Sequence, residues 1–274
     1  MALETRQYPR REDLRTRPWP RSVDWVETEI PVERMLLGMT PYGAHYGAIT
    51  QVGKRERQED GIVVHSNRDT WQTRVCVIDG IHSARDGDVA THIFGNVMSH
   101  IYRTRYQLHH PSNRARYAQQ HLAVSQDLTH EDSGVVYAEM CLCPRGRIEV
   151  DYMGDVQAAH FDSGGRLVEC TQPHREKDGR GVTRAVTHQQ YDQVEKKYFR
   201  RQSRHVYILA SDGLWDSVSP AVISEILQVT SATDSISKRV QEIVRRLNTA
   251  VQVQQANLGE DQGDNYTLFV SIEP

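Results

Sequence analysis

Acidic residues stand at the ends of five short apolar segments, and this feature limits how the chain can fold. The segments are rich in β-branched and aromatic residues, which predicts strands that are buried in a sheet. Because neighbouring strands lie side by side, their ends gather at one edge of a sheet or sandwich. The five sites are Glu59-Asp60 before GIVV, Asp79-Gly80 after VCVI, Gly154-Asp155 after VDYM, Asp212-Gly213 after YILAS and Asp264-Asn265 before YTLFV.

Carboxylates gathered at one edge need positive charge between them, because they would otherwise repel one another strongly. Mg²⁺ and Mn²⁺ are hard ions that take oxygen ligands. Two such ions about 3.5–4 Å apart can activate a water for in-line attack on phosphorus. Asp-Gly and Asp-Asn pairs are also common turn formers. The residues alone therefore leave two interpretations open: a metal centre, or five ordinary turns.

Short strands separated by turn residues continue from His45 onward, which predicts antiparallel sheets. Helices are predicted between the strands, and apolar residues at helical spacing mark the clearest of them. The predicted helices cover residues 88–106, 114–128, 220–229 and 235–252. Pro220 is expected in the first turn of its helix, where its missing N–H costs nothing.

Composition excludes several classes of protein. The formal net charge of the 274 residues is −3, which argues against nucleic acid as an obligatory partner. We expect no membrane span, because no apolar run approaches about 18 residues. The four cysteines lack the spacing of a zinc or redox motif, which favours free thiols in the cytoplasm. We expect residues 1–42 to form an Arg- and Pro-containing extension and residues 43–274 to form one domain.

Six motifs in order resemble those of the metal-dependent Ser/Thr protein phosphatases of type 2C. The resemblance covers residues 45–274. In the first half of the chain, GKRERQED resembles the family motif G-x-R-x-x-x-E-D, and VCVIDG resembles F-x-V-x-D-G. Further on, YMGDVQA resembles V-G-D-S-R-A, and VTRAV resembles L-T-R-A-x-G. Finally, ILASDGLWD is a near-literal match to the third Asp motif, and GDNYTLFV resembles x-D-N-x-T-x-x-V.

The resemblance implies an α+β fold, namely a four-layer α-β-β-α sandwich of two packed antiparallel sheets flanked by helices. It implies two core Mg²⁺ or Mn²⁺ ions and a third ion bound more weakly. Arg55 would bind the substrate phosphate, and Glu59 would accept hydrogen bonds from water in the centre. The implied metal ligands are Asp60, Asp79, the Gly80 carbonyl, Asp155, Asp212 and Asp264. Arg55, Glu59 and Asp79 are the expected catalytic residues.

The sequence departs from the family at the position that follows Asp79-Gly80. Members with a His there are thought to protonate the leaving group with it, whereas this chain has Ile81 and places His82 one residue later. A shift of one residue turns a side chain to the other face of an extended segment. Water bound to a metal ion is therefore the expected proton donor. For His82 two interpretations stay equally open, namely a displaced proton donor and a polar loop residue. The Ser and Arg of V-G-D-S-R-A are absent, and the following segment is short.

The resulting expectation is a hydrolase that removes phosphate from phosphoserine and phosphothreonine in proteins. We expect a cytoplasmic monomer that is linked to a Ser/Thr kinase and binds neither nucleic acid nor membrane. The first alternative is a pseudophosphatase that keeps the fold as a regulatory binding module. A second alternative is a phosphatase of small phosphorylated metabolites, because a metal centre does not specify what carries the phosphate.

Overall fold

The computed structural model describes residues 22–27, 30, 34–81, 86–104, 110–125, 133–144, 146–177, 181–233, 235–258 and 263–274. Within these residues the chain forms two β-sheets and five helices. The larger sheet has seven strands. In spatial order they are β1 (Ser22–Glu27), β4 (Asp60–Asn67), β5 (Gln72–Gly80), β6 (Gly134–Leu142), β7 (Arg147–Met153) and β11 (Glu195–Arg200), while β10 (Val186–Thr187) pairs with β6.

The smaller sheet has six strands in the described part of the chain. In spatial order they are β2 (Leu36–Met39), β3 (His45–Gln51), β13 (Tyr266–Ile272), β12 (Val206–Ala210), β8 (Gln157–Phe161) and β9 (Leu167–Cys170). All neighbouring strands in both sheets run antiparallel. The C-terminal strand β13 lies between β3 and β12. Segments from distant parts of the sequence therefore meet at the ends of these central strands.

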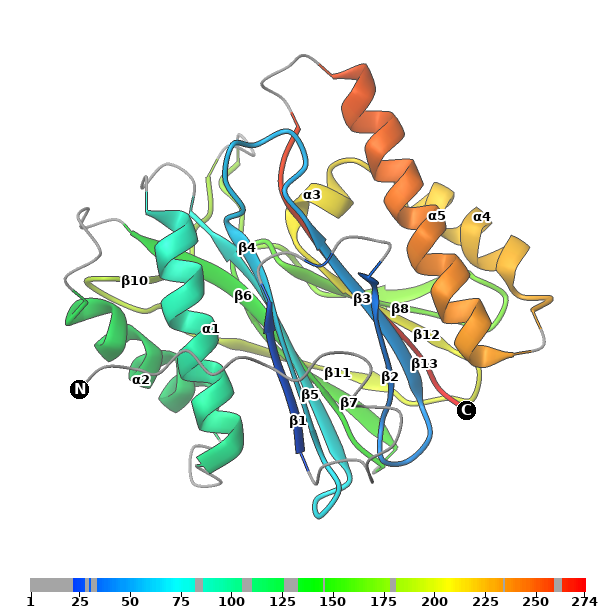
Figure 1. Cartoon of the computed structure of the whole chain (residues 1–274), viewed down its shortest axis with the longest axis horizontal. Helices are drawn as coiled ribbons and strands as arrows, with labels where there is room; N and C mark the ends of the chain where they lie inside the picture. Colours follow the sequence, from blue (N-terminus) through cyan, green and yellow to red (C-terminus); the bar gives the residue numbers. More distant parts are fainter. Residues whose placement is uncertain are drawn as a thin grey trace.

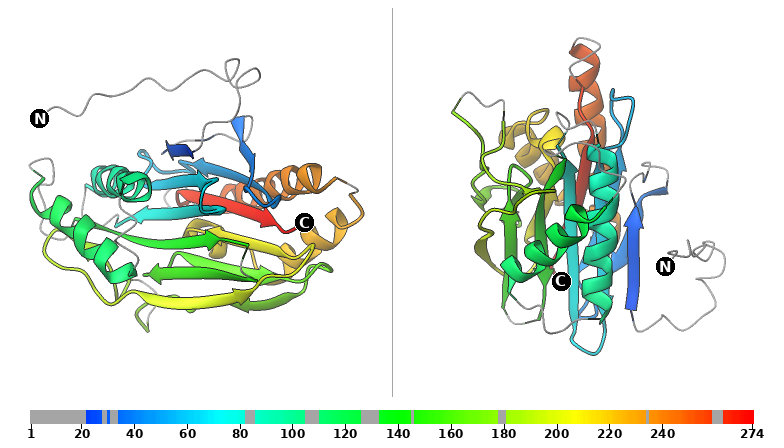
Figure 2. Two further views of the ribbon diagram at one scale, coloured as in Figure 1. Left: turned by 90° about the horizontal axis from the view of Figure 1, so that it is seen from below. Right: turned by 90° about the vertical axis from the view of Figure 1, so that its left-hand side faces the viewer.

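Helices cover both outer faces of the sheet pair (Figure 1). In the right-hand view of Figure 2, α1 lies in front of the sheets and α5 lies behind them. The four layers confirm the predicted α-β-β-α sandwich. The helices are α1 (Gly87–Thr104), α2 (Pro111–Ala123), α3 (Asp212–Trp215), α4 (Pro220–Thr230) and α5 (Ile236–Asn257).

Three buried clusters hold the layers together. The first lies between the two sheets and includes Val77, Tyr207 and Phe269. The second packs α4 and α5 against the smaller sheet, and the third packs α1 and α2 against the larger sheet. Alternation along β5 explains this arrangement, because Val77 faces the other sheet while Cys76 and Ile78 face α1. The strands are buried on both faces, as their continuous apolar runs predict.

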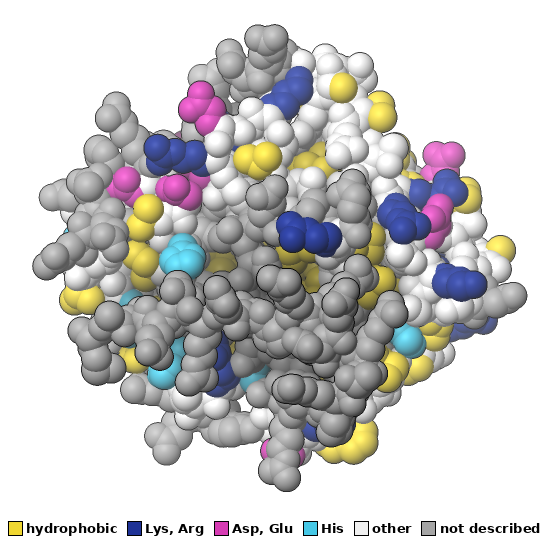
Figure 3. Space-filling view, viewed as in Figure 1, with side chains coloured by type: hydrophobic (Ala, Val, Ile, Leu, Met, Phe, Trp, Pro, Cys, Tyr) yellow, Lys and Arg dark blue, Asp and Glu magenta, His cyan; other side chains and the backbone are white. Residues whose placement is uncertain are grey.

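The helix termini follow the sequence signals. Pro220 stands in the first turn of α4, as predicted, and the Ser219 hydroxyl accepts a hydrogen bond from the Val222 N–H. Acidic and basic side chains are mixed on the outer surface near α5 (Figure 3), where Glu242 and Arg246 form an ion pair one helical turn apart. Among the described helices, none has the length and apolar character that a membrane crossing requires.

Two strands lie earlier in the chain than the sequence pattern indicated. We expected strands only from His45 onward, but β1 pairs with β4 and β2 pairs with β3. Part of the segment expected as an extension therefore belongs to the two sheets. The local sequence of β2 gives only a weak strand signal, because the strand is short, alternates between half-buried and exposed residues, and contains a glycine. Edge strands of this kind carry a weaker hydrophobic signal than central ones.

Candidate metal and phosphate site

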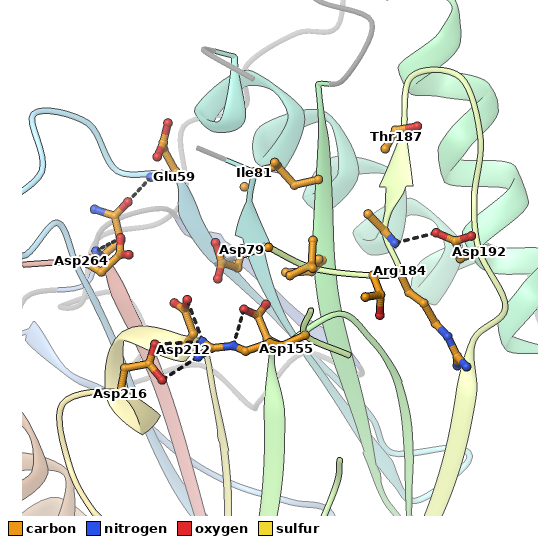
Figure 4. Close-up of a pocket in the computed structure, with 18 of the residues that line it drawn as sticks. Glu59, Asp79, Ile81, Asp155, Arg184, Thr187, Asp192, Asp212, Asp216 and Asp264 are labelled. Atoms are coloured by element: carbon orange, nitrogen blue, oxygen red, sulfur yellow. Dashed lines mark hydrogen bonds and ion pairs between the residues drawn. The ribbon is translucent and has the colours of Figure 1, made fainter. Parts of the chain in front are cut away.

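A cavity of about 630 Å³ lies where the central strands of both sheets end. Asp79 comes from the end of β5, Asp155 from the turn between β7 and β8, and Asp212 from the start of α3. Asp264 precedes β13. Figure 4 shows Asp79, Asp155 and Asp212 facing the same space, with Glu59 and Asp264 on one side and Arg184 and Asp192 on the other. Arg55 and Asp264, which are 209 positions apart in the sequence, thus share one cavity.

Close backbone packing draws these segments together at two glycines. A Cβ atom on Gly213 would lie 1.9 Å from the carbonyl oxygen of Asn265, so only glycine lets α3 approach the start of β13. A Cβ atom on Gly80 would lie 2.5 Å from the Gly87 carbonyl oxygen and 2.9 Å from that of Glu59. Both glycines directly follow an aspartate of the cavity. The Asp-Gly pairs therefore serve the packing of the site as well as the turn.

Three carboxylates form the centre of the cavity. Asp79, Asp155 and Asp212 each offer an oxygen atom within 4.8 Å of the other two. Burial raises the pKa of Asp79, and the neighbouring charges of Asp212, Asp60 and Asp155 raise it further. Burial likewise raises the pKa of Asp212, with Asp155 the strongest neighbouring charge. Like charges this close stabilise the protonated forms unless a cation lies between them.

Asp60 lies beside Asp79, because the two residues are direct partners across β4 and β5. The Ser211 hydroxyl donates a hydrogen bond of 2.6 Å to the Asp60 carboxylate. Burial raises the pKa of Asp60 to about 7, although the hydrogen bond from Ser211 acts in the opposite direction. Asp60 is 1% exposed and is not among the described residues that line the cavity. Asp60 therefore lies next to Asp79 and just outside the cavity.

Arg55 forms a two-point ion pair with Asp264. Its Nε atom donates to one carboxylate oxygen at 3.1 Å and its Nη2 atom donates to the other at 3.0 Å. Both residues line the cavity. This planar pairing is the geometry in which a guanidinium also binds two oxygens of a phosphate. A phosphate bound in this way would have to displace Asp264 from Arg55.

Glu59 is fixed through its backbone. Its N–H donates to the Asn265 side-chain oxygen at 3.0 Å, and its carbonyl accepts from the Gly80 N–H at 3.0 Å and from the Thr91 hydroxyl at 2.5 Å. Glu59 as a whole is 5% exposed, and it lines the cavity. These bonds join β4, β5, α1 and β13, so the position of Glu59 depends on the packing of all four elements.

Arg175 places a positive charge inside the carboxylate cluster. Its Nε atom donates to Asp155 at 3.0 Å, and its Nη2 atom donates to Asp212 at 3.1 Å. Both of its terminal nitrogens also donate to the two oxygens of Asp216 at 2.9 Å. The hydrogen bonds to Asp216 and the nearby carboxylates raise the pKa of Arg175, although burial opposes this shift. The guanidinium thus stays charged.

The far wall of the cavity is less acidic. Ile81, Val136, Val182 and Ala185 give it an apolar surface. Beside them the Ala185 N–H donates to the Asp192 carboxylate at 2.9 Å. This wall therefore combines apolar side chains with one carboxylate held by the backbone.

The donor set of the cavity fits a hard divalent cation. Its central ligand atoms are carboxylate oxygens, which Mg²⁺ and Mn²⁺ prefer, and the Gly80 carbonyl lies at the same strand end. Among the described residues that line the cavity, seven are acidic and three are arginines, so the formal charge of the lining is −4. Two divalent ions would balance this charge.

The structure brings the predicted site residues to one place. Of the residues expected from the sequence, Arg55, Glu59, Asp79, Gly80, Asp155, Asp212 and Asp264 line the cavity, and Asp60 lies directly behind it. His82 lies outside the described residues. Sequence reasoning missed Arg175 and Asp216. Asp216 follows Asp212 by one helical turn, a spacing that could have indicated a shared face, but Arg175 comes from an irregular segment without a local signal.

Solved structures of other proteins have the same fold as this chain. No protein-family model matches the sequence, and no curated protein matches it. Among solved structures, the chain resembles the Mycobacterium tuberculosis serine/threonine phosphatase PstP/Ppp, with a TM-score of 0.64, 18% identity, and coverage of 87% of this chain and 99% of that one. A serine/threonine phosphatase from S. agalactiae gives a TM-score of 0.65 at 14% identity, covering 84% of this chain and 100% of the other.

Two further structures contain metal ions. The catalytic domain of PstP was solved in complex with two manganese ions, and it matches with a TM-score of 0.62 at 18% identity over 84% of this chain and 97% of that chain. RsbX, solved in complex with magnesium, matches with a TM-score of 0.61 at 11% identity over 87% of this chain and 98% of its own. The chain described here therefore has the fold of the metal-dependent Ser/Thr protein phosphatases of type 2C.

Proposed function

We propose that this protein is a metal-dependent phosphomonoester hydrolase that removes phosphate from phosphoserine and phosphothreonine in proteins. The observation that carries the proposal is the meeting of Asp79, Asp155 and Asp212 within 4.8 Å in a cavity that Arg55 also lines. The neighbouring structures support it, since they are phosphatases and two of them hold manganese or magnesium.

The residues that would hold Mg²⁺ or Mn²⁺ are Asp60, Asp79, the Gly80 carbonyl, Asp155, Asp212 and Asp264. When bound, the ions supply an activated water and positive charge for the phosphate oxygens. Asp79 lies at the centre of this set, between Asp60 on the neighbouring strand and Asp212 across the cavity. It is therefore the residue best placed to serve two ions.

The remaining residues of the chain orient the reactants. Arg55 binds two oxygens of the phosphate and stabilises the charge that develops on them. Glu59 accepts a hydrogen bond from the attacking water and is held by three backbone interactions. Ile81 lines the cavity but has no proton to donate, so the leaving alkoxide takes its proton from water. The apolar far wall receives the peptide on either side of the phosphorylated residue.

The proposed partner is a phosphorylated protein, and hence a Ser/Thr kinase that supplies it. We further propose a monomer in the cytoplasm. Support for the compartment comes from the four cysteines, all of which are free, with Cys76 and Cys141 buried. Burial raises the pKa of the Cys76 thiol, which keeps it inert.

The proposal is tested by Mn²⁺-dependent release of phosphate from a phosphoserine peptide, with p-nitrophenyl phosphate and a sugar phosphate as comparison substrates. Turnover should depend on Mn²⁺, stop on addition of EDTA, and fall at least about 10²-fold in Asp79→Asn and Asp212→Asn. Asp69→Asn is the matched control, because Asp69 is exposed on the β4–β5 hairpin. Unchanged rates in the first two variants would falsify the assignment, and a preference for the sugar phosphate would transfer it to small metabolites.

One observation favours the alternative of a binding module without turnover. Arg55 and Arg175 neutralise Asp264, Asp155 and Asp212 with hydrogen-bonded ion pairs. Such pairs reduce the need for metal ions. A protein of this kind would bind the phosphopeptide with the same affinity in EDTA and in Mn²⁺ and would release no phosphate from it.

A further inference from the structure

Arg175 contacts the carboxylates that a metal ion would use. The guanidinium binds one oxygen of Asp155 and one of Asp212, two of the three residues in the metal-binding cluster. The side chain is 23% exposed, whereas that of Asp155 is 9% exposed. An ion coordinated by both aspartates would occupy the same gap as the guanidinium. The two cations therefore compete for this edge of the cavity.

Asp216 anchors the guanidinium in this place. It accepts hydrogen bonds from both terminal nitrogens of Arg175 at 2.9 Å. Asp216 is mostly exposed and follows α3, so it can hold Arg175 without being part of the central cluster. Three carboxylates thus share the planar donor group of one arginine, which is a more specific arrangement than a single surface ion pair.

The backbone links Arg175 to the cavity wall. Arg175 and Val182 form an antiparallel bridge, in which the Glu176 N–H donates to the Gly181 carbonyl at 2.8 Å. The Thr183 N–H donates to the His174 carbonyl at 2.8 Å. Gly181, Val182 and Thr183 line the cavity. If a metal ion displaces Arg175, this wall loses the contact that fixes it to Asp155 and Asp212.

We propose that Arg175 is an internal cation that takes the place of a divalent ion at the Asp155–Asp212 edge. Arg175 limits the cavity to two tightly bound ions. A further ion would have to displace Arg175, and its binding is therefore coupled to the position of the cavity wall at Gly181, Val182 and Thr183. The proposal rests on the proposed function of the cavity as a metal centre, and it makes Asp155 a ligand only of a further ion that enters when Arg175 moves away. The charge of the lining agrees with it, since −4 with Arg175 included is balanced by two divalent ions. Removal of Arg175 would leave −5.

The experiment measures Mn²⁺ binding rather than activity. Equilibrium dialysis of the full chain against Mn²⁺, with the bound metal determined by atomic emission, gives the number of ions and their affinities. Arg175→Gln should gain one further ion, or bind it at least about tenfold more tightly than the wild type, because a positive charge near the site is removed. Lys177→Gln is the matched control, since Lys177 is exposed in the same segment and does not line the cavity.

Asp216→Asn provides a second test that leaves Asp155 and Asp212 intact. It loosens the anchor of Arg175, which favours the further ion, but it also removes one negative charge from the cavity lining. The further ion should therefore bind more tightly than in the wild type and less tightly than in Arg175→Gln. Circular dichroism and the thermal midpoint confirm that each variant is folded; if Arg175→Gln is not, Asp216→Asn alone decides. Two ions of equal affinity in the wild type and in the folded variants would overturn the proposal but keep the metal centre. Absence of bound Mn²⁺ from all proteins would overturn both.

Discussion

Asp79→Asn is expected to change the stability of the protein in opposite directions with and without metal. Without metal, the Asp79 carboxylate lies within 4.8 Å of Asp155 and Asp212 and raises the electrostatic energy of the folded state. Asparagine has nearly the same shape but no charge. With metal, the same carboxylate is the central ligand of the proposed ions. The substitution thus removes repulsion in EDTA and removes binding energy in Mn²⁺.

The size of the effect follows from the geometry. Two unit charges about 4.8 Å apart repel by about 3.5 kcal/mol at an effective dielectric constant of about 20. Asp79 makes two such pairs, but its raised pKa and the charge of Arg175 relieve much of this energy. We expect a net gain of about 2 kcal/mol for Asp79→Asn in EDTA at pH 8, which is about 4–8 °C in thermal midpoint for a domain of this size.

The order should reverse in Mn²⁺. An ion at 100 times its dissociation constant stabilises the folded state by about 2.7 kcal/mol. Two ions therefore stabilise the wild type by about 5 kcal/mol, and the variant loses most of this gain. Differential scanning fluorimetry of both proteins in EDTA and in Mn²⁺ measures the four midpoints. An Asp79→Asn variant that is less stable than the wild type in EDTA would contradict the expected repulsion, and an equal rise of both midpoints in Mn²⁺ would contradict the role of Asp79 as a ligand.

Three further predictions concern other residues. Arg55→Ala should raise KM for a phosphopeptide about 10- to 100-fold with Mn²⁺ affinity retained, because the lost charged hydrogen bonds contribute about 1.5–3 kcal/mol; loss of Mn²⁺ affinity with unchanged KM would contradict the phosphate role. Arg114→Ala should lower the free energy of unfolding by about 3 kcal/mol in urea titrations, because it removes the buried cation between Glu139 and Asp151 and leaves them only their ion pairs with Arg74 and Lys196. The exposed Arg116→Ala should change it by less than about 0.5 kcal/mol. In EDTA, the stability that protonated Asp60 contributes at low pH should be lost as the pH rises from about 4 to about 7. Burial raises the pKa of Asp60 to about 7 in the folded state, whereas the unfolded chain has already released the proton in this range. Asp60→Asn should flatten this part of a plot of unfolding free energy against pH.

The fold could be predicted from the sequence largely because its central strands are buried on both faces. The runs VCVI and YILA are continuous and apolar, and β5 and β12 form there. Helices α1 and α5 show clear apolar stripes, and these stripes pack against the two sheets. β1 and β2 could not be predicted in the same way. They are held by pairing with β4 and β3, which a local pattern does not reveal.

The acidic part of the site was predictable because each member stands at a strand end. Asp79 and Asp212 stand at the C-terminal ends of buried strands and Asp264 precedes one, and the antiparallel sheets bring these ends together. The arginine contacts were not predictable. Arg175 reaches Asp155 and Asp212 through an irregular segment, and the pairing of Arg55 with Asp264 depends on the tertiary packing of two distant segments. Long side chains from loops carry no periodic signal.

The most direct test of the central claim is an anomalous diffraction map of crystals grown with Mn²⁺, measured at the manganese absorption edge. The claim is that carboxylates from distant segments meet in order to bind divalent cations. It predicts two strong peaks beside Asp79, with Arg175 still in contact with Asp155. A map without peaks in the cavity, with Asp264 bound by Arg55 and Asp212 by Arg175, would contradict it.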